Sequence, residues 1–203
     1  MSQPAFESAG PYLVIGLGNP GAQYVATRHN IGQLVVDLLA ARTRVTLKKT
    51  PRISAEVAET RLASPPAPKI ILAKSLTFMN LTGGPVAALS KYYKVAPDQV
   101  IAVHDDVDLP FGAVRLKLGG GEGGHNGLRD ITKALGTREY LRVRLGVGRP
   151  PGNQDTADYV LNRFSARERV TLAASLDDGA DAVVGLVSNG LLATQQDFHS
   201  RVH

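Results

Sequence analysis

Two hydrophobic periods alternate along this chain. Apolar runs or strict alternation of apolar and polar residues predict six strands, at residues 12–17, 53–62, 69–74, 99–104, 113–118 and 141–147. Apolar residues spaced as on one face of a helix predict helices over residues 31–39, 82–94, 126–135 and 157–164, and a last helix that ends near Gly190. The second and third strands flank the Pro-rich turn SPPAP, so we expect them to pair as a hairpin.

Helix-boundary residues fit this assignment. Pro85 is tolerated in the first turn of its helix, and Gly136 follows residues 126–135 as a C-cap. Ser165 and Glu168 have the spacing of a capping box. Because strands and helices interleave, we predict an α/β fold, a single domain with a mixed, mostly parallel central sheet flanked by helices. The domain is expected to cover residues 1–203, with residues 1–10 as a flexible N-terminal extension.

Composition narrows the chemistry. The 203 residues contain 43% hydrophobic and 20% charged residues, which suits one globular domain. There is no cysteine, which excludes disulfides, thiolate zinc sites and a cysteine nucleophile. The N-terminus lacks the pattern of a signal peptide, and no apolar run is long enough to span a bilayer, so we expect a cytoplasmic protein. The net charge of +5 fits either a polyanionic partner or simple solubility.

Gly16, Gly18 and Gly21 match the dinucleotide-binding pattern G-x-G-x-x-G. In that pattern the glycines open a helix, whose N-terminus holds the pyrophosphate. Here Pro20 and a polar stretch delay the helical period until about Ile31, and no strand ending in an acid follows at the required distance. We therefore reject a nucleotide cofactor.

Acidic residues follow the predicted strand at 99–104. In open α/β sheets ligands bind outside the carboxyl ends of strands, and this strand leads into His104, Asp105, Asp106 and Asp108. Three interpretations stand: a solvated turn, a metal site without a compact ligand motif, or an Asp that orients a distant histidine. His29, in a polar loop after the first strand, is a candidate for that histidine, although a lone histidine is more often a cap or surface residue.

The run GGGEGGHNG at residues 119–127 is the strongest local signal. Many glycines cost backbone entropy, and this run leads into a helix N-terminus, where anions bind. A phosphate is the expected guest, and a flexible loop capped by Asn126 is the alternative. The chain has no G-x-S-x-G or S-x-x-K motif, so water activated by a histidine is the expected nucleophile of any hydrolase.

Six segments together resemble the bacterial peptidyl-tRNA hydrolase family. They occur in the family's order between about Tyr12 and Phe164 and read GLGNPG, TRHN, FMN, HDDVDLP, GGGEGGHNGLRDI and RVRLGVGRP. The resemblance implies an esterase that frees tRNA from peptidyl-tRNA released by stalled ribosomes. The sequence departs from the family's pattern only slightly, at Glu122 in the glycine run and at Asp106.

The resemblance also implies roles for individual residues. By position His29 is the catalytic base, Asp105 orients it, and Asn19 selects blocked over free amino groups. The residues implied to line the peptide and terminal-nucleotide cleft are Tyr24, Phe78, Asn80 and Asn126. The residues implied to face the tRNA are Arg115, Lys117, Arg129 and Arg144. No metal or other cofactor is expected, the partner is peptidyl-tRNA through its acceptor stem and terminal adenosine, and the protein is expected to be a monomer.

Two rival functions remain open from the sequence. One is a non-catalytic RNA-binding relative, which would have no use for a base and its orienting carboxylate. The other is a metal-dependent nucleotide hydrolase that uses the acidic cluster, which would lose activity on chelation.

Overall fold

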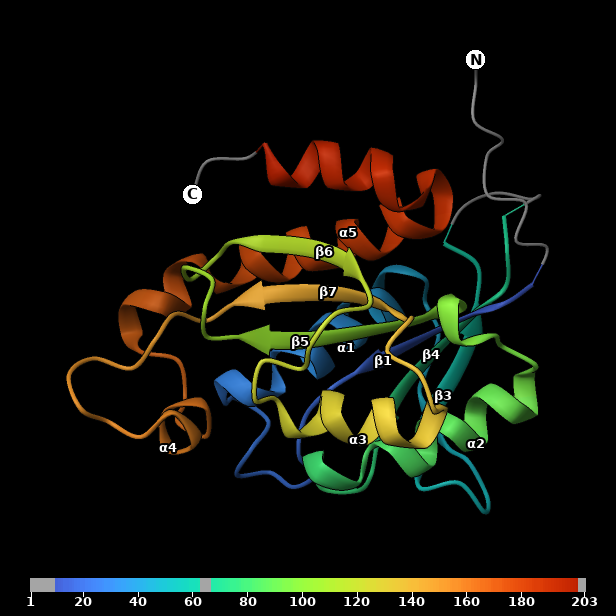
Figure 1. The fold of residues 1–203 in the computed structure, drawn as a ribbon, viewed down its shortest axis with the longest axis horizontal. Helices are drawn as coiled ribbons and strands as arrows, with labels where there is room; N and C mark the ends of the chain where they lie inside the picture. The colour runs from blue at the N-terminus through green and yellow to red at the C-terminus, as the bar shows by residue number, and fades with distance from the viewer. Residues whose placement is uncertain (1–9, 63–66, 201–203) are drawn as a thin grey trace.

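The computed structural model describes residues 10–62 and 67–200. These residues form one α/β domain around a seven-stranded sheet with the order β2-β3-β4-β1-β5-β7-β6 (Figure 1). The strands are β1 (Tyr12–Gly16), β2 (Lys48–Lys49), β3 (Ala55–Thr60), β4 (Ile70–Ser75), β5 (Val100–Asp106), β6 (Val114–Leu118) and β7 (Leu141–Gly146). The predicted α/β fold is confirmed.

The sheet is mixed, as predicted. Its four central strands, β4, β1, β5 and β7, run parallel. The edges are antiparallel, where β6 pairs with β7 on one side and β2 and β3 continue the sheet beyond β4 on the other. The predicted hairpin is confirmed, because β3 pairs with β4 from Ala55↔Ser75 to Thr60↔Ile70.

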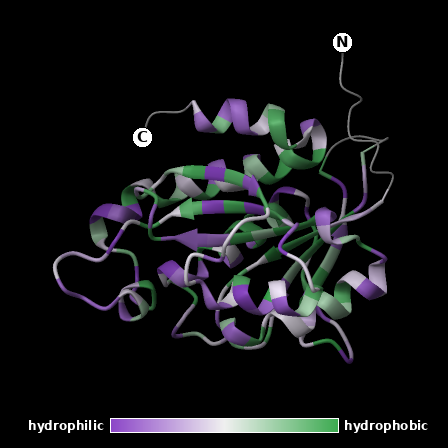
Figure 2. Cartoon of the chain, viewed as in Figure 1, coloured by the Kyte–Doolittle hydropathy of each residue, from purple (hydrophilic) through white to green (hydrophobic). Residues whose placement is uncertain are grey.

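Helices cover both faces of the sheet. They are α1 (Ile31–Arg42), α2 (Gly83–Tyr93), α3 (Asn126–Leu135), α4 (Thr156–Val160) and α5 (Ala166–His199), with short 3-10 turns at Arg28–Asn30, Met79–Leu81 and Pro97–Gln99. One apolar cluster joins α1 and α5 to one face, and a second joins α2 and α3 to the other. Figure 2 shows the central strands largely hydrophobic and the outer helix turns hydrophilic, as this layering requires.

Three elements differ from the sequence prediction. Strand β2 was not predicted, and α4 ends at Val160 rather than at residue 164. The last helix does not end at Gly190, because Gly190 takes a non-helical conformation (φ 78°, ψ 174°) and a further helical segment reaches His199. That segment lies over the outer strand β6 (Figure 1), where Gln195 donates a hydrogen bond to the carbonyl of Leu116.

The predicted caps are confirmed at two helix ends. Gly136 adopts the left-handed conformation that ends α3 (φ 71°). Ser165 and Glu168 form the reciprocal capping box that starts α5. No helix within residues 10–62 and 67–200 has the length and apolar character needed to cross a membrane. The predicted flexible extension, residues 1–10, lies outside the described residues except for Gly10.

Glycines allow α1 to begin directly against the sheet. A Cβ on Gly16 would lie 2.4 Å from the carbonyl oxygen of Gly32, and a Cβ on Gly32 would lie 2.0 Å from that of Val103. Neither distance is possible for a larger residue. This contact places the turn before α1, which carries His29, beside the carboxyl ends of β1 and β5. The glycine at position 16 therefore serves packing and not a phosphate.

Candidate active site

A cavity of about 910 Å³ opens at the carboxyl ends of the central strands. After β1 the chain continues to strands on one side of it in the sheet order, and after β5 it continues to β6 and β7 on the other side. The cavity therefore lies between β1 and β5, where the strand order reverses. Its lining includes His29 after β1, Asp105 in β5 and the start of α3 at Asn126. Asp105 and Asp106 belong to β5 itself, whereas the sequence had placed the strand's end at residue 104.

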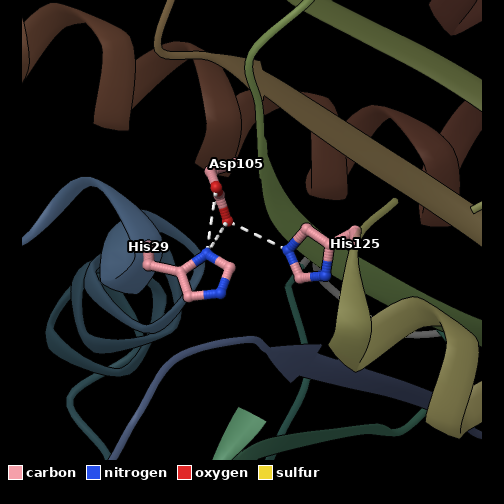
Figure 3. Close-up of side chains that lie close together, drawn as sticks. All are labelled: His29, Asp105 and His125. Carbon is pink, nitrogen blue, oxygen red and sulfur yellow. Dashed lines mark hydrogen bonds and ion pairs between the residues drawn. The ribbon is translucent and has the colours of Figure 1, made fainter. Parts of the chain in front are cut away.

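His29 and Asp105 are in direct contact, as Figure 3 shows. His29 Nδ1 lies 2.9 Å from Oδ1 and 3.0 Å from Oδ2 of the Asp105 carboxylate. A carboxylate only accepts hydrogen bonds, so Nδ1 carries the proton and Nε2, on the other side of the ring, is left with a free lone pair. The structure thus brings together the two residues, 76 positions apart, that the sequence named as base and orienting group.

A second histidine shares the same carboxylate. His125 Nε2 lies 3.0 Å from Asp105 Oδ1 (Figure 3). His125 Nδ1 accepts a long hydrogen bond (3.4 Å) from the backbone N–H of Leu128. The second contact requires Nδ1 to be unprotonated, so Nε2 is the donor to Asp105. The sequence alone did not single out His125. Asn126 was expected as the possible cap of α3, which is wrong, because the side chain at the N-cap is that of His125.

The two imidazoles determine the charge states of the site. Burial alone would raise the pKa of Asp105, but the charges of His29 and His125 and their hydrogen bonds hold it well below its usual range. Asp105 is therefore ionised at any physiological pH. Burial opposes the charged form of His29, yet the charge of Asp105 and its hydrogen bond outweigh burial and raise the pKa of His29 above 6.5.

His104 lies next to this group and stays neutral. It is 3% exposed, its ring centroid is 5.1 Å from that of His125, and its Nδ1 donates to the carbonyl of Asp105 at 2.7 Å. Burial, followed by the charge of His125, places the pKa of His104 well below 6.5. The Nε2 atom of His104 has no hydrogen-bond partner among the described residues. His104 thus supports the site as a neutral ring and does not compete for a proton.

Asn19 is held in place by two other segments. Its Oδ1 accepts a hydrogen bond from the backbone N–H of Met79 at 2.8 Å. Its backbone N–H and carbonyl both bond to the side chain of Asn30, each at 2.9 Å. Since Oδ1 is already engaged, the NH₂ group of Asn19 is the part left to donate into the cavity.

The four predicted cleft residues fall into two groups. Phe78, Asn80 and Asn126 line the cavity, and 52% of Phe78 is exposed. Tyr24 does not line it but packs edge-on against Phe78, with ring centroids 6.4 Å apart. Asn126 accepts a hydrogen bond from Arg129 through Oδ1, which leaves its NH₂ group available.

The four predicted tRNA-facing residues also separate. Lys117 and Arg144 line the cavity, and Arg144 donates to Asp106 at 2.8 Å. Arg115 does not line it, because its guanidinium bonds to the carbonyls of Val114 and Phe198. Arg129 lies exposed at the start of α3, outside the cavity lining.

Arg142 and the glycine run are bound to each other. The guanidinium of Arg142 is fully buried, donates to the carbonyls of Gly120 and Gly121 at 2.8 and 2.6 Å, and lies over the ring of Tyr140. The Arg142 guanidinium therefore satisfies both of these carbonyls from within the protein. The run is therefore held against β7 through its carbonyls, and a phosphate bound to its N–H groups stays a prediction. The charge of Glu122 is matched by Arg138 at 2.9 Å.

The acidic cluster does not converge into a metal site. Asp106 pairs with Arg144, and Asp108 pairs with Arg149 at 2.5 Å. A different group could hold an ion, since atoms of His29, Asp105 and His125 lie within 4.8 Å of one another. In the structure both imidazoles lie within hydrogen-bond distance of the carboxylate, at 2.9 and 3.0 Å, and each of these nitrogens would have to lose its proton to bind a metal ion.

Arg28, which the sequence alone did not single out, fixes one wall of the cavity. Its guanidinium forms two hydrogen bonds to Glu168, at 2.7 and 3.1 Å, and three more to the carbonyls of Tyr159, Asn162 and Arg163. Residues 156, 157, 160 and 161 around α4 line the cavity. Arg28 thus ties that wall to the turn that carries His29.

Comparison with known proteins agrees with this geometry. The family model described as peptidyl-tRNA hydrolase matches residues 13–203. Peptidyl-tRNA hydrolase of Pseudarthrobacter chlorophenolicus is 56% identical over 188 residues, covering 93% of this chain and 95% of its own length. That of Frankia alni is 57% identical over 191 residues, covering 94% and 95%. The crystal structure of the Acinetobacter baumannii enzyme superimposes with a TM-score of 0.84 at 33% identity, covering 93% of this chain and 94% of that one.

A more distant likeness concerns the fold alone. Arabidopsis thaliana 5′-methylthioadenosine nucleosidase aligns with a TM-score of 0.51 at 9% identity. The family model and the two bacterial relatives cover nearly the whole chain. The fold likeness at 9% identity does not change the family assignment. This chain therefore belongs to the peptidyl-tRNA hydrolase family, and it is an enzyme of that class.

Proposed function

We propose that His29 is the general base of a water-mediated ester hydrolysis. The contact of its Nδ1 with Asp105 at 2.9 Å carries this proposal, because it leaves Nε2 free to take a proton from water. The water oxygen attacks the ester carbonyl that joins the peptide to the terminal ribose. As the tetrahedral intermediate collapses, the His29 imidazolium returns its proton to the departing ribose oxygen. Asp105 remains ionised and stabilises the imidazolium between these two steps.

Nearby amides suit the charge that develops on the carbonyl oxygen. Asn80 and Asn126 line the cavity, and an amide N–H placed there lowers the energy of an oxyanion. Phe78, with Tyr24 packed against it, offers an exposed aromatic surface to a base or an apolar side chain. These four residues are proposed to bind the peptide and the terminal adenosine.

Asn19 is proposed to select for a blocked amino group. Its Oδ1 is held by Met79, so it presents an N–H donor to the cavity. The first amide carbonyl of a peptidyl or N-acyl ester can accept that hydrogen bond. A free aminoacyl ester offers a charged ammonium there instead, which has only donors, so the donor of Asn19 would go unpaired.

Lys117 and Arg144 are proposed to bind phosphates of the acceptor stem. Arg115 and Lys117 on β6 lie opposite Arg144 and Arg142 on β7, so four cations share one face of the sheet. Arg115 and Arg129, at its margins, are proposed to contribute weaker phosphate contacts. The protein is proposed to act as a monomer, and the substrate supports action in the cytoplasm.

The test of this function is hydrolysis of an N-acetyl-aminoacyl-tRNA beside its unblocked counterpart. We expect the blocked ester to be cleaved and the unblocked ester to be largely spared. The same assay on a short N-blocked ester of a CCA oligonucleotide, after dialysis against a strong chelator, should retain its rate. Loss of that rate with recovery on adding zinc or manganese would instead favour a metal held by His29, Asp105 and His125.

A further inference from the structure

One basic segment of the chain lies outside the cavity. Between Asp37 and Glu56 the sequence contains no acidic residue but five cations, of which Arg42 pairs with two carboxylates of α5. We define the basic edge as Lys48, Lys49 and Arg52, which lie on β2 and on the turn to β3 and are all exposed. None of the three side chains forms an ion pair or a side-chain hydrogen bond within residues 10–62 and 67–200.

The nearest carboxylates are engaged elsewhere. Asp37 and Glu56, which bound the basic segment, both contact Lys74, at 2.6 and 3.6 Å. Glu56 lies opposite Lys49 in the strand pairing, yet its carboxylate reaches toward β4. Glu59 pairs with Lys69 at 2.5 Å. The positive charge of the basic edge is therefore not compensated by the neighbouring strands.

Strand register places the basic edge level with the active site. Lys49 pairs with Glu56, Glu56 with Lys74, and Lys74 with Gly16, from which the chain leads to His29. The row spans three strand spacings, or about 14 Å. On the other side it continues through β5 and β7 to β6, where Lys117 lies next to the row, so the sheet from Lys49 to Lys117 measures at most about 29 Å.

The turn that carries Arg52 faces the same end of the sheet as the cavity. The turn joins β2 to the first residue of β3, Ala55, which pairs with Ser75. Ser75 closes β4 just before Phe78, a residue of the cavity lining. A backbone bond from Leu76 to the carbonyl of Ser54, at 2.8 Å, fixes the turn there. Cations that form no ion pair among the described residues therefore lie toward both edges of the sheet, on β2 and on β6, and the cavity lies at the carboxyl ends of the strands between them.

We propose that the basic edge is a second phosphate-binding surface, which contacts the sugar–phosphate backbone of the substrate tRNA away from the ester. The inference rests on the proposed contact with tRNA on the Lys117 side. A tRNA carries a phosphate at every nucleotide, so a chain whose end enters the cavity presents phosphates well beyond the acceptor stem. Cations on both flanks attract such a polyanion at little cost in specificity, because phosphate contacts carry no sequence information.

The test compares two double variants on two substrates. Lys48→Gln with Lys49→Gln removes two charges from the basic edge. Lys91→Gln with Lys94→Gln removes two exposed charges from the end of α2, at the opposite end of the sheet, as a matched control. For each variant, kcat and KM are measured on N-acetyl-aminoacyl-tRNA over a salt series and on the short CCA ester.

We expect KM on the full tRNA to rise several-fold in the basic-edge variant alone, with kcat and the short-ester kinetics unchanged. The log–log salt slope should flatten by roughly one to two units, about 0.9 for each duplex phosphate that the variant no longer neutralises. Lys48→Arg with Lys49→Arg should keep the parent KM. The parent's cleavage of the short ester tests the hydrolase function separately.

Three results would overturn the proposal. One is a KM on full tRNA within twofold of the control variant, which would leave the lysines only their protective role at an exposed sheet edge. Another is an equal rise in KM on both substrates, which would place the effect in the cavity. The third is an equal rise in the control variant, which would indicate a response to net charge alone.

Discussion

The catalytic centre and the basic face of β6 and β7 border one cavity but manage charge in opposite ways. In the centre a single buried carboxylate, Asp105, accepts hydrogen bonds from two imidazoles, so geometry and protonation are both fixed. On the basic face Lys117, Arg142 and Arg144 lie together, and the one carboxylate that pairs with any of them among the described residues is Asp106, which pairs with Arg144. Burial, then the charges of Arg142 and Arg144, lower the pKa of Lys117, as expected where cations crowd.

This difference separates chemistry from binding. A hydrogen-bonded, buried centre is suited to act on a substrate already in place, because its groups need not reorganise. A face crowded with cations attracts a polyanion, and bound phosphates offset the repulsion among those cations. Changes in the centre should therefore lower kcat, and changes on the basic face should raise KM for tRNA while sparing a minimal ester.

The largest effect in this series is expected for Asp105→Asn. The amide cannot stabilise the His29 imidazolium and can hold the ring in the wrong tautomer, so kcat on the short CCA ester should fall about 10²–10⁴-fold. Thermal unfolding of the variant should be measured alongside. A folded variant with kcat within a few-fold of the parent would contradict the role of Asp105 in the catalytic centre.

His125 should matter less than Asp105 but through the same carboxylate. Loss of its hydrogen bond to a charged group is worth about 1.5–3 kcal/mol, or roughly 10–100-fold in kcat. His125→Asn keeps a residue that can cap α3, whereas His125→Ala removes the cap and about 1 kcal/mol of stability as well. Both variants should lose kcat and some stability, and the alanine variant, which also lacks the cap, should unfold at the lower temperature of the two. Loss of kcat in the alanine variant alone would reduce His125 to a helix cap.

The pH profile should show one acid limb. His29 must be unprotonated to act as base, and its folded pKa lies above 6.5, so the rate on the short ester should fall about tenfold per pH unit below that value. Asp105 stays ionised and should add no limb in the same range. A profile that is flat down to about pH 5 would contradict the assigned base.

On the basic face a smaller, substrate-dependent effect is expected. Lys117→Gln should raise KM for N-acetyl-aminoacyl-tRNA several-fold and flatten its salt slope by roughly one unit, with the short ester little changed. Lys133→Gln, on the exposed side of α3, is the matched control. Equal damage to both substrates would assign Lys117 to the catalytic centre and remove the separation between the two regions.

The sequence predicted the elements well where a period repeats and poorly where it does not. The helix from Ile31 and the hairpin of β3 with β4 have clear periods, and both are confirmed. Strand β2 has two residues, too few to show alternation. At Gly190 the apolar pattern resumes beyond the break, so the sequence shows a stop but not the helical segment that follows.

The site shows a similar division. His29 and Asp105 lie after or within strands that meet at the sheet's carboxyl edge, and the resemblance to the family paired them. His125 was hidden in the glycine run, where only the folded loop turns its ring toward Asp105. Alternation placed Arg142 and Arg144 on one face but could not show that Arg142 is buried under the carbonyls of that run.

The most direct test of the account is kcat of His29→Ala on the short CCA ester, with and without added imidazole. The site predicts a fall of about 10²–10⁴-fold, since a positioned base is removed, in a protein that remains folded at the assay temperature. Free imidazole should restore part of the rate, because the space left beside Asp105 can admit it. A kcat within a few-fold of the parent, or a loss that imidazole leaves unchanged, would contradict His29 as the general base.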